Sequence, residues 1–168
     1  MTREDLQNLV TEIIEETYKL KEKYITESIG VIDYVAIIPA SIEQQKIFEN
    51  LMLGLGVMIY SYPDASGKLF FLNDPLQTKF GEIKLITVRQ YKSDDHRLGY
   101  LDFQTDNYLK LKEKYSQKKN FIVIQDDGWE LFGVEEPQAK VAFYIPDNPL
   151  SQDSEVKKFT ENNISRIE

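Results

Sequence analysis

Apolar positions in the first 28 residues recur at the spacing of a helix face, with Glu and Lys between them. The positions that carry this pattern include Leu6, Leu9, Val10, Ile13, Ile14, Leu20 and Tyr24. Thr2 and Asp5 have the spacing of a capping box, and Gly30 follows as a stop signal. The pattern predicts one long helix over residues 2–28, which either packs on the rest of the chain or serves as a dimerisation arm.

After this helix, the same order of predicted elements occurs twice: a strand, a helix and three further strands. In the first half these are residues 31–38, 41–56, 57–62, 68–72 and 82–88. In the second half they are residues 98–104, 106–117, 121–125, 129–134 and 141–145. The pattern therefore predicts an α+β fold, in which a long N-terminal helix precedes two βαβββ modules that form one curved mixed sheet.

The predicted organisation has four parts. They are an N-terminal helix (residues 1–30), a first module (31–92), a second module (98–146) and a polar tail (147–168) that is a short helix or disordered. The stretches PDASG and QDDG have the composition of hairpin turns, and NDP predicts a break after the third strand.

Strand alternation predicts which side chains share a face of the sheet. In the second module, Tyr100, Asp102 and Gln104 point one way, whereas Leu101 and Phe103 point toward the helices. Polar side chains on a central strand need partners or water, which favours a ligand-sized cavity, although a hydrogen-bonded sheet face gives the same pattern. The predicted ligand-binding residues are Tyr34, Tyr100, Asp102, Gln104 and Trp129.

The net charge of the chain limits the classes of partner that it is expected to bind. A net charge of −8 over 168 residues argues against nucleic acids and anionic membranes, both of which attract basic surfaces. The chain has no cysteine, which excludes disulfides and thiolate metal sites and agrees with a reducing compartment. The start MTREDLQ lacks the basic and apolar regions of a signal peptide, and no run is long enough to span a membrane. We therefore expect a cytoplasmic protein.

Imidazole and thiolate metal ligands are scarce, since the chain has one histidine and no cysteine. His96 is the single histidine, so sites with several His ligands are excluded. If a divalent metal ion binds, the residues available to hold it are Glu82, Glu130 and His96, with Mg²⁺ or Mn²⁺ as the ion that oxygen ligands suit. The interpretation favoured by the sequence has no cofactor.

The order of elements, with first strands that read IDYVAI and GYLDF, resembles the vicinal-oxygen-chelate superfamily, which includes glyoxalase I, extradiol dioxygenases and bleomycin-resistance proteins. The resemblance covers residues 31–146 and implies paired modules around a cup-shaped ligand site. The leading helix is also similar to that of small glyoxalase-like bacterial proteins of the YecM type. Metal-using members of the superfamily carry a His in the first strand, where this chain has Tyr34 and Tyr100. A phenol stays protonated at neutral pH, so the usual metal ligands are missing.

Three functions agree with these patterns. The favoured one is a metal-free, glyoxalase-like module that binds a small organic molecule in the cup. The alternatives are a metal-dependent lyase, isomerase or dioxygenase of the same superfamily, and a protein-interaction or structural protein that uses the N-terminal helix. The expected partners are a small organic ligand and, as an assembly, a homodimer.

Overall fold

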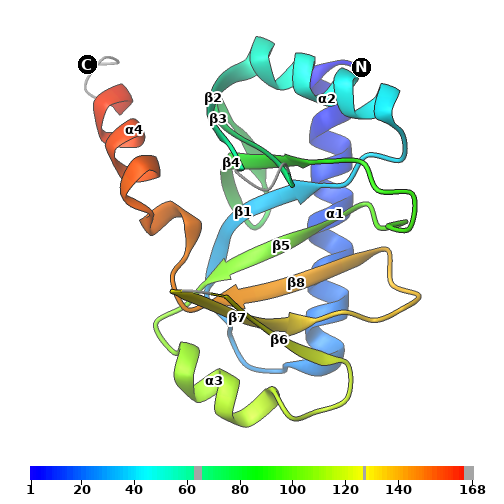
Figure 1. Cartoon of the computed structure of the whole chain (residues 1–168), viewed down its shortest axis with the longest axis vertical. Coiled ribbons are helices and arrows are strands. Elements are labelled where there is room, and N and C mark those ends of the chain that lie inside the picture. The colour runs from blue at the N-terminus through cyan, green and yellow to red at the C-terminus, as the bar shows by residue number, and fades with distance from the viewer. Residues whose placement is uncertain (63–65, 127, 165–168) are drawn as a thin grey trace.

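Eight strands form a single mixed sheet in the computed structural model, which describes residues 1–62, 66–126 and 128–164 (Figure 1). The helices are α1 (Arg3–Tyr24), α2 (Ile42–Leu55), α3 (Tyr108–Tyr115), the short 3₁₀ helix η1 (Leu150–Gln152) and α4 (Ser154–Ile164). The strands are β1 (Val31–Ile37), β2 (Gly56–Ser61), β3 (Gly67–Thr78), β4 (Gly81–Arg89), β5 (Gly99–Gln104), β6 (Phe121–Asp126), β7 (Trp129–Val134) and β8 (Val141–Pro146).

The strand order β2-β3-β4-β1-β5-β8-β7-β6 places the two modules side by side, with their first strands at the centre. Within each module the first strand lies parallel to the last: β1 pairs with β4, and β5 pairs with β8. Between the modules, β1 and β5 run antiparallel, so that Tyr34 lies opposite Asp102 and Ala36 lies opposite Tyr100. This topology confirms the predicted α+β fold with two βαβββ modules.

The long N-terminal helix is also confirmed, and it packs on the chain's own sheet. Thr2 and Asp5 form the predicted capping box, in which each backbone N–H is bonded by the other side chain. Leu6, Val10, Ile13 and Ile14 are fully buried, in a cluster with Val35, Ile37, Leu101 and Phe103 of the central strands. Figure 1 shows α1 running the length of the sheet between α2 and α3. The apolar stripe of α1 is therefore used within the molecule, which favours packing over a dimerisation arm.

The sheet consequently has two distinct faces. We call the face that contacts α1, α2 and α3 the helix face; it carries Val35, Leu101 and Phe103. We call the opposite face the cup face; its buried residues form a second, smaller cluster that includes Tyr34, Tyr100 and Tyr144. The strand alternation inferred from the sequence predicted this division for β5, with Tyr100 on one face and Leu101 and Phe103 on the other.

Two glycines are required by the way the central strands meet their surroundings. Gly30, which precedes β1, has a φ of 104°, a conformation that L side chains rarely adopt, and a Cβ there would lie 1.9 Å from the Gln104 carbonyl oxygen. Gly99 begins β5, where a Cβ would lie 2.1 Å from the Ala36 carbonyl oxygen and 2.8 Å from Ile13. Any side chain at Gly99 would push β5 away from both β1 and α1.

Two local expectations differ from the structure. The NDP stretch does not end the third strand, because β3 continues to Thr78 and pairs with β4 beyond it. The pairing with β4 shifts register between Phe71 and Leu76, so Asn73–Pro75 lie in an irregular stretch of β3. Pro75 therefore does not end the strand. The tail, for which the sequence left helix or disorder open, forms η1 and α4. The predicted turns PDASG and QDDG fall partly on residues 63–65 and 127, which lie outside the described residues.

Candidate functional site in the cup face

The centre of the cup face is lined by tyrosine rings. Tyr34 on β1 and Tyr100 on β5 have ring centroids 6.2 Å apart, and Tyr100 and Tyr144 on β8 have centroids 5.0 Å apart, both with edge-to-face geometry. Burial raises the pKa of all three phenols, so they remain protonated at neutral pH. Each hydroxyl can therefore donate or accept a hydrogen bond.

Asp102 lies among these rings and is the most unusual polar residue of the sheet. It is 5% exposed, and its Oδ1 atom has no hydrogen-bond partner within the described part of the chain. The pKa of Asp102 is raised to about 8, first by burial and then by the charge of Asp33, while Tyr34 and Arg89 act in the opposite direction. At neutral pH this carboxyl is mostly protonated and can donate a hydrogen bond.

Arg89, the last residue of β4, supplies positive charge to the same region. Its guanidinium carbon lies 5.7 Å from the ring centroid of Tyr62 and 5.9 Å from that of Tyr100. Tyr62 in turn lies beside the buried Thr87 of β4, with their oxygens 3.5 Å apart. The cup face therefore combines positive charge from Arg89, the buried carboxyl of Asp102 and several phenols.

Asp33 joins the cup face through an irregularity in β1. The pairing of β1 with β5 shifts register between Ile32 and Tyr34, and the Asp33 carboxylate accepts the Ser151 N–H, with 3.3 Å to each oxygen. Burial raises the pKa of Asp33, and the bonds from Ser151 oppose this shift. Asp33 thus ties the C-terminal segment to the central strand.

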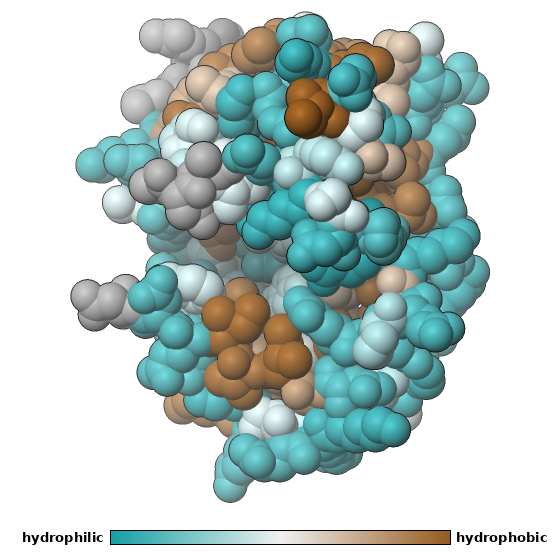
Figure 2. Space-filling view, turned by 45° about the vertical axis from the view of Figure 1, so that its right-hand side comes forward, coloured by the Kyte–Doolittle hydropathy of each residue, from teal (hydrophilic) through white to brown (hydrophobic). Residues whose placement is uncertain are grey.

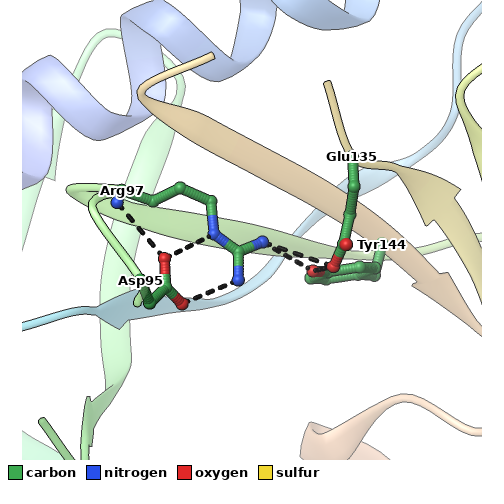
Figure 3. Close-up of polar contacts among 4 residues, drawn as sticks. All are labelled: Asp95, Arg97, Glu135 and Tyr144. Atoms are coloured by element: carbon green, nitrogen blue, oxygen red, sulfur yellow. Dashed lines mark hydrogen bonds and ion pairs between the residues drawn. The ribbon is translucent and has the colours of Figure 1, made fainter. Parts of the chain in front are cut away.

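A second polar network holds Tyr144 in place (Figure 3). The Arg97 guanidinium donates to both Asp95 oxygens, at 2.8 and 2.7 Å, and its Nη1 donates to the Tyr144 hydroxyl at 3.0 Å. The Tyr144 hydroxyl donates to Glu135, which also pairs with Arg97 at 3.3 Å. The inter-module linker is therefore bonded to the end of β7 and to β8, next to the tyrosine cluster.

The predicted ligand-binding residues separate into two groups. Tyr34, Tyr100 and Asp102 come together at the centre of the cup face. Gln104 lies half-buried at the end of β5, where it accepts a 3.5 Å hydrogen bond from the Ser151 hydroxyl. Trp129 begins β7, is 42% exposed and lies outside that central group.

The residues considered for a metal ion do not converge. Glu130 lies on the α3 side of β7, where it accepts hydrogen bonds of 2.6 Å from both Tyr108 and Lys112. Glu82 is exposed on β4 and bonds Gln77, and His96 is exposed in the linker. Residues 1–62, 66–126 and 128–164 contain no group of three or more His, Asp or Glu side chains that could hold a metal ion. The described residues therefore do not fit a metal site of the kind that metal-using members of the superfamily carry.

Two clefts border the sheet. One of about 250 Å³ lies against the cup face and is lined by Asp33, Gln104, Leu85 and Phe71, with Ser151, Val156 and Thr160 from the C-terminal segment. The other, of about 270 Å³, lies on the linker side between α1, α2 and residues 91–98, and includes His96. Asp102, which is buried, lines neither cleft.

The outer surface agrees with the acidic composition. Figure 2 shows a face that is mostly hydrophilic, with one compact apolar patch in its lower half. Exposed apolar residues on the β6–β7 hairpin include Val123, Ile124 and Trp129. No helix in the described ranges is both long enough and apolar enough to cross a bilayer.

Sequence reasoning missed several residues of the cup. Arg89 and Tyr144 could have been found, because alternation along β4 and β8 places them on the same face as Thr87 and Ala142. Asp33 could not, since its place on the cup face depends on an irregularity in β1. Arg97 could not either, because its partners Glu135 and Tyr144 are 38 and 47 residues away in the sequence.

Comparisons with known proteins support the fold and leave the function open. No protein-family model matches the sequence, and no curated protein sequence matches it. A solved structure described as structural-genomics protein EC4020 aligns with a TM-score of 0.67 over 91% of this chain and 92% of that chain, at 10% identity. At this identity the likeness is one of fold alone.

Other solved structures align less well. A glyoxalase/bleomycin resistance protein/dioxygenase superfamily member from Vibrio splendidus 12B01 covers 67% of this chain and 94% of its own, with a TM-score of 0.41 at 12% identity. Streptomyces coelicolor methylmalonyl-CoA epimerase, in complex with 2-nitronate-propionyl-CoA, covers 71% and 97%, with a TM-score of 0.41 at 14% identity. The strand order, with paired βαβββ modules and a leading helix, confirms the predicted α+β fold, and the likeness to EC4020 is one of that fold, whereas membership of the vicinal-oxygen-chelate superfamily stays a prediction.

Proposed function

We propose that the cup face binds a small organic molecule that carries hydrogen-bond acceptors, without a metal ion. The observation that carries this proposal is the Oδ1 atom of Asp102, a buried polar atom with no partner among the described residues. Leaving such an atom unsatisfied costs about 1–3 kcal/mol, and a ligand group that bonds it recovers part of this cost. Unsatisfied buried polar atoms are uncommon in folded proteins and call for an explanation, and a role in ligand binding is one such explanation.

The surrounding groups define the chemistry of this ligand. A protonated Asp102 and the phenols of Tyr34 and Tyr100 offer donors, and Arg89 nearby favours an acceptor that carries negative charge. Small carboxylates, carbonyl compounds and phenolates have this character. A carboxyl with a pKa of about 8 is also suited to proton transfer near neutral pH, so turnover of the ligand is compatible with the site.

The test is a protein-observed NMR screen of the full-length, isotope-labelled protein against a library of small carboxylates, 2-oxo acids and phenols. We expect a compound whose binding perturbs the amide signals of Tyr34, Tyr100 and Asp102. Asp102→Leu, which removes both carboxyl oxygens at similar volume, should weaken this binding at least tenfold, which is about 1.4 kcal/mol. Glu130→Gln is the matched control, because Glu130 lies on the α3 side of β7.

Binding that maps to the linker-side cleft at His96, or that is equally strong in Asp102→Leu and Glu130→Gln, would contradict the proposal. The library is screened in parallel with Mg²⁺ and Mn²⁺. Binding that needs either ion would favour the metal-dependent alternative. The cytoplasmic location and the homodimer remain predictions.

A further inference from the structure

The C-terminal segment lies against the cup face, on the side of the sheet opposite α1. Val156 of α4 is fully buried in the cluster that contains Tyr34, Tyr100 and Tyr144, and Leu150 packs against the same cluster. The Phe159 ring meets the Phe71 ring edge-on, with centroids 5.7 Å apart. Figure 1 shows α4 standing beside β2 and β3, apart from the other helices.

The attachment of this segment is much weaker than that of α1. In α1, Leu6, Val10, Ile13 and Ile14 are all fully buried, whereas in the described side chains of α4 only Val156 is buried. Ser151 bonds the sheet through long hydrogen bonds: its N–H donates to Asp33 at 3.3 Å, and its hydroxyl donates to Gln104 at 3.5 Å. Segments held by few buried apolar contacts open locally at a small fraction of the cost of global unfolding.

The helix α4 also has an N-terminal cap that does not depend on the sheet. The Asp153 carboxylate accepts the backbone N–H of Glu155 at 2.8 Å and that of Val156 at 3.4 Å. An N-cap of this kind stabilises a helix in isolation from its tertiary contacts. The segment can therefore move away from the sheet as a helix instead of unfolding first.

The space between this segment and the sheet forms the route to the buried carboxyl. The 250 Å³ cleft is bounded by Ser151, Val156 and Thr160 on one side and by Asp33 and Gln104 on the other. Gln104, which lines this cleft, is two positions from Asp102 on the same face of β5, and Asp102 itself does not line the cleft while the segment is in place. Glu82 and Lys84 lie at the outer rim of the cleft.

We propose that η1 and α4 (residues 150–164) form a lid over the cup face, which opens while the sheet stays folded and whose inner surface, at Ser151 and Thr160, forms one wall of the ligand site. The role of the lid in ligand entry rests on the proposed binding at Asp102. The opening itself is a property of the free protein. A ligand that reaches Asp102 enters through the cleft as the lid moves outward.

The cysteine-free chain permits a direct test, because each introduced thiol is unique. Val156→Cys places a thiol on the inner side of the lid itself. Val35→Cys is the matched control, since both valines are fully buried but Val35 lies on the helix face. Alkylation by iodoacetamide is measured in the full-length protein over a range of low urea concentrations. We expect Val156→Cys to react at least 100-fold faster than Val35→Cys, with a rate that hardly depends on urea because local opening exposes little surface.

A second variant reports on the cup without altering the lid. Ala142→Cys lies on the floor of the cup face, and it should also react faster than Val35→Cys. Adding Phe159→Ala, which removes the ring contact with Phe71, should speed the reaction of Ala142→Cys about tenfold and leave that of Val35→Cys unchanged, as expected when about 1.4 kcal/mol of lid contact is lost.

Equal rates and equally steep urea dependence for Val156→Cys, Ala142→Cys and Val35→Cys would overturn the lid, because α4 would then open only with the whole protein. This outcome is distinguishable from a failure of the proposed function, since alkylation requires no ligand. If α4 does not open locally but a ligand still binds at Asp102 in the NMR screen, the cup face remains the binding site and only the lid proposal is wrong.

Discussion

The two faces of the central strands β1 and β5 differ in chemistry although they alternate along the same residues. Toward α1, Val35, Leu101 and Phe103 are fully buried in an apolar cluster. Toward the cup, Tyr34, Tyr100 and Asp102 are almost as deeply buried but carry hydroxyl and carboxyl groups. Burial of apolar groups stabilises the fold, whereas burial of a poorly bonded carboxyl costs stability. The comparison indicates that the helix face maintains the fold, and it supports the proposal that the cup face binds a ligand.

The largest effect is expected on the helix face. Phe103→Ala removes a fully buried ring that meets Tyr18 and Phe143 edge-on, and it should lower the free energy of unfolding by about 3–5 kcal/mol. Tyr100→Phe on the cup face keeps the ring and should cost about 1 kcal/mol or less. Urea unfolding of the two variants measures both values, and similar losses would remove the distinction between the faces.

The next effect concerns the pH dependence of stability. Asp102 has a pKa of about 8 in the folded protein and about 3.8 as an unperturbed carboxyl, so between these values the unfolded chain binds fewer protons than the folded protein. The stability contributed by this group is therefore complete below pH 3.8 and falls by about 1.4 kcal/mol for each unit as pH rises toward 8.

Asp102→Asn imitates the protonated carboxyl and should remove most of this slope. We expect the unfolding free energy of the variant, relative to that of the parent protein, to increase by several kcal/mol between pH 4 and pH 7. Asp106→Asn, at an exposed position after β5, is the control and should follow the parent. Parallel curves for the parent and Asp102→Asn would show that Asp102 is ionised in the folded state.

A smaller loss is expected where the linker joins the second module. Arg97→Ala breaks the bonds to Asp95 and Tyr144 shown in Figure 3 and should lower stability by about 1–3 kcal/mol. Arg97→Lys should recover only part of this loss, because a lysine cannot bond both Asp95 oxygens in the same planar geometry. Thermal or urea unfolding measures the effect, and full recovery in Arg97→Lys would show that charge alone is needed.

The smallest change is Tyr144→Phe, which keeps the ring against Tyr100 and removes the hydroxyl that bonds Glu135 and Arg97. We expect a loss of about 1 kcal/mol in stability. If Tyr144 also positions the cup, the NMR-detected ligand should bind this variant more weakly than the parent. Unchanged affinity would limit the network in Figure 3 to a structural role.

Much of the fold was predictable because its signals are local. The capping box at Thr2, the helical stripe of α1 and the alternation along β1 and β5 lie within a few residues of sequence. Periodicity of this kind assigns each side chain to a face before any long-range contact is known. Tyr34, Tyr100 and Asp102 were placed on one face for this reason.

The tertiary structure decided what those faces contain. The polar tail was ambiguous in the sequence, and its place over the cup depends on Val156 and on the bond from Ser151 to Asp33, 118 residues away. The pKa of Asp102 likewise follows from burial beneath rings of several strands, and the partners of Arg97 come from the far end of the second module. The sequence by itself therefore determined the elements and the two faces, because these follow from local periodicity. The depth of the carboxyl, its missing partner and its cover were decided only by packing between distant segments, which no local pattern encodes.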